Sequence, residues 1–129
     1  MGRPASNRPT DGELAILNVL WERGPSTVRE VQEALSVERD TAYTTALKML
    51  QIMADKGLVT RDESHRTHVY TAASEREDTQ SHLARDLARR AFGGSAAQLA
   101  MRALSEEAAS AEELAAIREL LDRFERASE

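Results

Sequence analysis

The sequence predicts a mainly α-helical protein in which three helices and a two-stranded hairpin precede a purely helical region. Apolar residues recur at helical spacing up to residue 56, β-branched and aromatic residues cluster between 58 and 72, and the pattern is wholly helical from Ser74 onward. A chain of 129 residues is one ordinary domain or two small ones. We expect a disordered arm at 1–9, a first domain at 10–73 and a helical dimerisation domain at 74–129.

The first two helices are predicted from their capping residues. Thr10-Asp11-Gly12-Glu13 forms a capping box, and the helix that follows ends at Gly24-Pro25. Ser26-Thr27 offers a second cap before a short helix. The residues predicted to pack are Leu14, Leu17, Leu20 and Trp21 on the first helix and Val28, Val31 and Leu35 on the second.

The third helix is predicted from Asp40 to Lys56, where Gly57 ends it. Projected at about 100° per residue, it has an apolar side and a polar side. The apolar side holds Ala42, Ala46, Met49, Leu50 and Met53. The polar side holds Thr41, Thr44, Thr45, Lys48, Gln51 and Asp55. An ordinary solvated face favours Glu and Lys, so the threonines of this face indicate a binding surface.

The two segments after the third helix, Leu58–Glu63 and Thr67–Ala72, favour extended backbone and are joined by a short link, Ser64-His65-Arg66. Three helices followed by a hairpin predict a winged helix-turn-helix, whose third helix enters the major groove of DNA. Threonine, lysine and glutamine side chains suit base edges, and hairpin cations suit phosphates. The predicted DNA-binding residues are Thr41, Thr44, Thr45, Lys48, Gln51, Arg61, His65 and Arg66; Arg3 and Arg8 of the arm are further candidates.

The net charge disfavours DNA binding, because a nucleic-acid-binding protein usually carries a patch of basic residues. The chain has a net charge of −5, with nine basic and ten acidic residues in 1–72 and eight and twelve in 73–129. Phosphate contacts must therefore come from local placement of cations. The alternative is a winged helix that acts as a protein–protein adaptor, which would show no salt-dependent affinity for DNA.

The tail from Ser74 is predicted to form three helices. A charged helix runs to Phe92, Gly93-Gly94 breaks it, and Ser95 caps the next. A capping box at Ser110–Glu113 precedes a seam at coiled-coil spacing. The residues predicted to dimerise are Leu83, Leu87, Leu99, Leu114, Ile117, Leu121 and Phe124.

Several classes of function are excluded or disfavoured. The absence of cysteine excludes disulfides, thiolate catalysis and cysteine-bound metal, and we expect no cofactor and no metal. His65 and His68 with Glu63 are the alternative metal ligands, but a set of fitting geometry is not evident. We find no nucleophile–base pair or phosphate-binding glycine loop, so we expect no enzyme. The apolar runs are too short for membrane insertion and residues 1–10 hold no apolar signal core, so we expect a cytoplasmic protein and no secretion.

Several stretches of the sequence resemble the penicillinase-repressor (BlaI/MecI/CopY) family. The resemblance rests on residues 11–17, Leu20-Trp21, residues 27–31, residues 42–50, residues 55–59 and His68-Val69-Tyr70. It implies a homodimer that binds double-stranded DNA at an inverted-repeat operator and represses transcription. It also implies that the face of the third helix and the hairpin arginines contact DNA, and that the tail dimerises.

Two departures from the family bear on the inducing signal, which the sequence does not define. The β-lactam-responsive relatives are cleaved at an Asn-Phe bond in the tail, where this chain has Arg102-Ala103 by position. We therefore do not expect that cleavage, and a membrane sensor protease stays an open alternative as partner. The copper-responsive branch uses cysteine pairs, so a copper-thiolate sensor is excluded.

Overall fold

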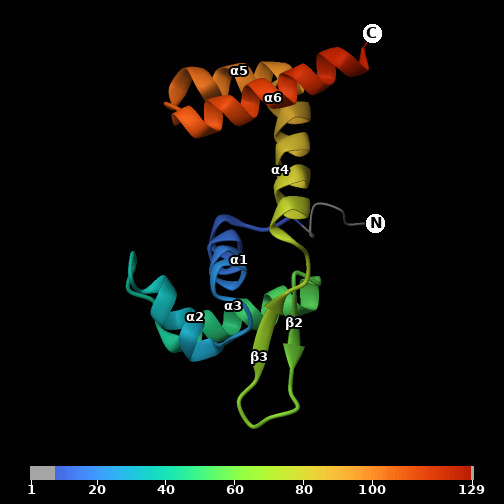
Figure 1. Ribbon diagram of the computed structural model, residues 1–129. Helices are drawn as coiled ribbons and strands as arrows, with labels where there is room; N and C mark the ends of the chain where they lie inside the picture. Colours follow the sequence, from blue (N-terminus) through green and yellow to red (C-terminus); the bar gives the residue numbers. More distant parts are fainter. Residues whose placement is uncertain (1–7, 129) are drawn as a thin grey trace. The chain divides into compact units, whose positions relative to one another are not determined.

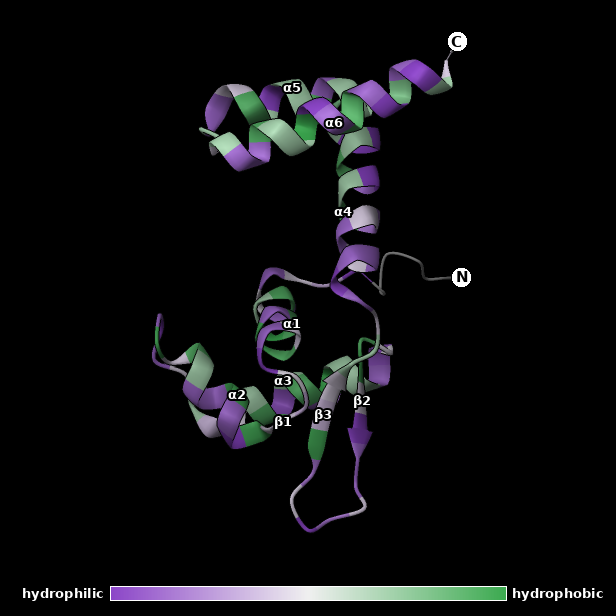
Figure 2. Ribbon diagram, in the orientation of Figure 1, coloured by the Kyte–Doolittle hydropathy of each residue, from purple (hydrophilic) through white to green (hydrophobic). Residues whose placement is uncertain are grey.

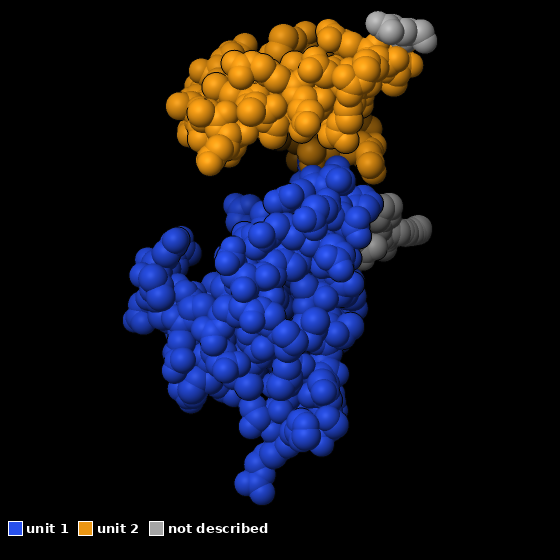
Figure 3. Space-filling model, in the orientation of Figure 1, with its two compact units in different colours: residues 1–83 blue, residues 84–129 orange. Residues whose placement is uncertain are grey.

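The computed structural model describes residues 8–128. They fall into two compact units, with the boundary between residues 83 and 84, and each is described by itself (Figure 3). Arg3 and most of the predicted arm lie outside the described residues. The elements in order are α1 (Asp11–Arg23), β1 (Ser26–Thr27), α2 (Val28–Leu35), α3 (Tyr43–Lys56), β2 (Val59–Asp62), β3 (Val69–Ala72), α4 (Arg76–Ala91), α5 (Ala96–Glu106) and α6 (Ala111–Ala127) (Figure 1).

The predicted caps of α1 and α2 are confirmed. The Thr10 hydroxyl accepts a hydrogen bond from the Glu13 amide (3.2 Å), and the Glu13 carboxylate accepts one from the Thr10 amide (2.9 Å). Thr27 and Glu30 form the same reciprocal pair at α2. Each box satisfies two amides that the helix leaves without a partner, so these starts are fixed locally.

The predicted start of α3 at Asp40 is wrong, because α3 begins at Tyr43. The residues before it form a turn, in which the Thr41 amide donates to the Ser36 hydroxyl (3.2 Å) and the Thr41 hydroxyl donates to the Arg39 carbonyl (2.8 Å). Ala42 is extended and supplies no side-chain cap. The predicted end is confirmed: Gly57 has a φ of 82°, a left-handed conformation that glycine adopts at little cost.

The hairpin belongs to a three-stranded antiparallel sheet in the order β1-β3-β2, whereas the sequence predicts two strands. The added strand β1 pairs Ser26 with Tyr70 and Thr27 with Val69. The β2 and β3 strands are shorter than predicted and their loop is longer. The Asp62 carboxylate accepts a hydrogen bond from the Ser64 amide (2.9 Å), and this local turn ends β2.

The core of the first unit joins α1, α2, α3, β2 and β3. Its buried members are Ile16, Leu17, Leu20, Val28, Val31, Ala46, Leu50, Met53, Val59 and Tyr70. Leu14, Trp21 and Leu35, which the sequence predicts as packed, are half-buried at the edge of this core. Trp21 donates its indole N–H to the Ser74 carbonyl (2.9 Å), and its ring lies beneath the Arg76 guanidinium. Helix α2 packs against the buried side of α3 and leaves the opposite face of α3 exposed.

In the second unit the predicted helix breaks are confirmed at Gly93-Gly94, Ser95 and Ser110. Ala88 is the one buried side chain among residues 84–128. Neither α5 nor α6, over its described length, has a buried residue, although both carry hydrophobic segments (Figure 2). Among the described residues, no helix has the length and apolar character needed to cross a membrane.

Candidate nucleic-acid interface

The exposed face of α3 is the first part of the candidate interface. Ala46, Leu50 and Met53 are buried, so the helix is anchored along one side. Thr44, Lys48 and Gln51 are exposed on the other side. The division of α3 into a packed and a polar side is therefore confirmed for residues that lie within the helix.

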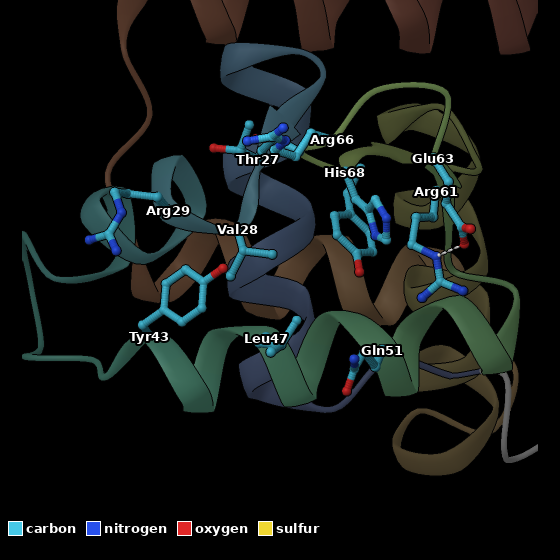
Figure 4. A pocket seen from close by; sticks show the side chains of 12 residues that line it. Thr27, Val28, Arg29, Tyr43, Leu47, Gln51, Arg61, Glu63, Arg66 and His68 are labelled. Carbon is cyan, nitrogen blue, oxygen red and sulfur yellow. Dashed lines mark hydrogen bonds and ion pairs between the residues drawn. The ribbon is translucent and has the colours of Figure 1, made fainter.

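A groove with a volume of about 550 Å³ runs beside this face, between α2, α3 and the hairpin. It brings Gln51 of α3 together with two predicted hairpin residues, Arg61 and Arg66. Figure 4 shows Tyr43, Leu47 and Gln51 along α3, with Arg29 at one end of the row and Arg61 at the other. Cations from α2 and the hairpin thus line one concave surface, although the unit as a whole carries no excess of basic residues.

Arg29 and Tyr43 form a contact that the sequence does not predict. The Arg29 guanidinium carbon lies 5.1 Å from the centre of the Tyr43 ring, within the range of a cation–π interaction. Both side chains line the groove. A signal was present, because Arg29 is a cation in the first turn of α2, where the helix dipole disfavours positive charge.

Arg61 is tied to a neighbouring carboxylate on the hairpin. Its Nε lies 2.6 Å from Oε2 of Glu63. Hydrogen bonding to the Tyr70 side chain and to Glu63 raises the pKa of Arg61 above its ordinary value, so this residue is permanently cationic. Glu63 also lines the groove. The hairpin therefore presents one arginine already paired with an anion of the protein itself.

The other predicted DNA-binding residues lie outside this groove. Thr41 lies in the turn before α3, and Thr45 lies on the α1 side of α3, where it lines a second depression with Met49 and Val37. His65 is exposed in the hairpin loop. His68, which the sequence offers as a metal ligand, lines the groove. Among the residues that the structure describes, no three His, Asp or Glu side chains group as a potential metal site.

The predicted dimerisation residues divide into two sets by exposure. Leu83, Leu99 and Ile117 are half-buried, and Leu87, Leu114, Leu121 and Phe124 are exposed. Phe124 has 62% of its surface exposed and Leu121 53%, which is high for large apolar side chains at regular spacing on one helix. Leu104, Leu120 and Met101 are exposed as well and were not predicted.

Three helices, a β-hairpin and an exposed polar helix face beside a cationic groove define a winged helix-turn-helix protein of the DNA-binding class. A model of the penicillinase repressor family matches residues 9–123. The chain belongs to the penicillinase repressor family, whose members are DNA-binding transcriptional repressors and not enzymes.

Individual relatives agree with this assignment. The chain is 37% identical over 116 residues to the transcriptional regulator BlaI of Mycobacterium tuberculosis, covering 89% of this chain and 83% of that protein. The DNA-binding domain of the repressor BlaI, solved in solution, matches 60% of this chain and 93% of its own, with 26% identity and a TM-score of 0.50. A complex structure of hsRosR-S4 matches 97% of both chains with a TM-score of 0.53; its 19% identity shows a shared fold alone.

Proposed function

We propose that the chain acts as a homodimeric repressor that binds an inverted-repeat operator in double-stranded DNA through α3 and the hairpin. The observation that carries this proposal is the continuity of the polar α3 face with the groove that holds Arg29, Arg61 and Arg66. A helix whose other side is buried in the core can enter a major groove without loss of packing. The cations beside it are then placed to meet the flanking phosphates.

The contacts divide by chemistry into base recognition and backbone positioning. Thr44 and Thr45 present hydroxyls and methyls for base edges, Lys48 suits guanine or a phosphate, and Gln51 suits adenine. Arg61, Arg66 and His65 of the hairpin donate to phosphates, as does Arg29. Thr41 contributes from the turn that leads into α3. We therefore expect α3 to determine which DNA sequence is preferred, and the cations of the groove to account for most of the salt dependence.

The tail supplies the dimer in this proposal. Residues 84–128 bury almost no apolar side chain within one chain, so α5 and α6 gain a core only by packing against another surface. A second copy of the same chain offers the matching seam, namely Leu83, Leu87, Leu99, Leu114, Ile117, Leu121 and Phe124. A dimer would also place two heads on two half-sites, as an inverted repeat requires. We place this protein in the cytoplasm, where it meets DNA, and leave a membrane sensor protease as an open partner.

Selection of genomic fragments by the purified protein, followed by binding titrations at several salt concentrations, tests the proposal. We expect one recurrent inverted repeat and a log–log salt slope of about −0.9 for each phosphate contacted. Equal recovery of all fragments, or affinity that does not change with salt, would contradict operator recognition. Sedimentation of the free protein tests the dimer separately.

A further inference from the structure

Glu63 is the one carboxylate among the described residues that line the groove, where it lies among arginines. The groove is otherwise lined by uncharged or cationic side chains, including Arg29, Arg61 and Arg66. A carboxylate at this place repels the DNA phosphates that the groove is proposed to meet. Its position therefore calls for a physical reason.

The fold does not supply that reason. Glu63 directly follows the last residue of β2, its side chain is 54% exposed, and its ion pair with Arg61 lies on the surface. Exposed ion pairs contribute little to stability. Arg61 is held besides by its strand pairing opposite Tyr70. Removal of the Glu63 charge should thus leave the hairpin folded.

The close contact with Arg61 indicates a role in binding instead. An oxygen 2.6 Å from the Arg61 Nε occupies a donor that a phosphate oxygen would use. A phosphate can take this donor only by displacing Glu63, and the displaced carboxylate then adds repulsion nearby. Replacing Glu63 by a phosphate at Arg61 costs the same free energy on any DNA sequence, so it weakens every protein–DNA complex. Only complexes with good base contacts on α3 then remain strongly populated.

We propose that Glu63 limits the affinity of the groove for DNA: it occupies Arg61 as a phosphate would and thereby weakens binding to every duplex, so that only duplexes with good base contacts on α3 stay bound. This inference rests on the proposed function and adds to it the control of one phosphate contact. The alternative role for Glu63, acceptance of a hydrogen bond from a cytosine amino group, predicts the opposite effect on operator affinity.

The experiment compares wild type with Glu63→Gln, which keeps the side-chain shape, and with Glu75→Gln, which removes the same charge outside the groove. Affinity is measured by fluorescence anisotropy for the selected operator duplex and for an unrelated duplex over a salt series. We expect Glu63→Gln to bind both duplexes about twofold to fivefold more tightly, the range set by couplings of exposed ion pairs. The salt slope should steepen by about 0.9, because one more phosphate is neutralised.

A second pair of variants separates release of Arg61 from simple loss of repulsion. In an Arg61→Gln background the gain from Glu63→Gln should shrink to the part that comes from lost repulsion, because the donor that Glu63 holds is gone. A gain of the same size in both backgrounds overturns the proposal, as does an unchanged affinity or a loss confined to the operator duplex. Failure of the wild type to bind any duplex in a salt-dependent way would instead refute the proposed function, and this inference with it.

Discussion

Lys56, the last residue of α3, places its Nζ 2.8 Å from Oε1 of Glu13 in the first turn of α1. The Glu13 side chain is 7% exposed and the Lys56 side chain 22%. The same Glu13 also closes the capping box with Thr10. One side chain thus fixes the start of α1 and the end of α3, so the helix proposed to contact DNA is held at its far end by an ion pair.

Lys56→Met should lower the free energy of unfolding by about 1–3 kcal/mol at neutral pH, because it leaves a buried carboxylate without its partner. Burial acts to raise the pKa of Glu13, but hydrogen bonds from Lys56 and Thr10 and the charge of Lys56 outweigh it, so the pKa lies below its ordinary value. A carboxyl group whose pKa is lowered by folding stabilises the folded state at pH values above its pKa in the unfolded chain. This contribution is lost as the pH falls through the pKa of the group in the folded protein. Urea unfolding at equal protein concentration should therefore show a difference that shrinks as pH falls from about 5 towards 3.

The chain provides a matched control, because its two lysines, Lys48 and Lys56, both lie on α3. Lys48 is exposed, so Lys48→Met should change stability by less than about 0.5 kcal/mol. A Lys56→Met difference that stays constant with pH would assign the effect to packing of the lysine alkyl chain rather than to the ion pair.

Much of the fold could be predicted because its signals are local. The capping residues Thr10, Thr27 and Ser110 each act within four residues, and Gly57 ends α3 by its own backbone conformation. The start of α3 could not be predicted this way, since it depends on a hydrogen bond between Thr41 and Ser36 in the preceding turn. Strand β1 is two residues long and exists only by pairing with β3, so no pattern within it marks it.

The candidate site was predictable to the extent that one helix defines it. Periodicity alone separates Thr44, Lys48 and Gln51 from the buried side of α3, because the two sides of a helix differ every three to four residues. The groove joins side chains of α2, α3 and the hairpin, and their proximity follows from packing. The contact of Arg29 with Tyr43 spans fourteen positions of sequence and a turn of non-standard length, so spacing could not predict it.

Lys48→Met should weaken DNA binding, since Lys48 lies at the centre of the exposed α3 face. If Lys48 contacts a base, the loss is about 1–3 kcal/mol and is confined to duplexes that carry that base. If it contacts a phosphate, affinity falls for all duplexes and the salt slope becomes shallower by about 0.9. Titration of the operator, a single-base variant series and an unrelated duplex distinguishes these results; wild-type affinity for all of them would remove Lys48 from the interface.

Leu121→Asp should dissociate the proposed dimer, because its α6 seam would then bury a carboxylate in place of a leucine. The loss is expected to be about 2–5 kcal/mol for each protomer, in the range of large core deletions with an added charge penalty. Ala115→Asp is the control, as Ala115 is exposed on the side of α6 away from the seam. Sedimentation velocity should find Leu121→Asp monomeric and Ala115→Asp dimeric. A dimeric Leu121→Asp protein would place the interface elsewhere in the tail.

Arg29→Gln tests whether the contact between α2 and α3 is part of the DNA interface. Arg29 is exposed at the first turn of α2, and its contact with the Tyr43 ring holds it over the groove. A guanidinium so placed donates to a phosphate without reading a base, so its loss should weaken operator and unrelated duplexes by the same factor. The salt slope of binding should become shallower by about 0.9. The melting temperature should stay within a few degrees of wild type. Arg85→Gln, which removes an exposed cation from α4, should leave the slope unchanged. Equal salt slopes for wild type and both variants would mean that DNA phosphates contact α3 and the hairpin but not Arg29 of α2.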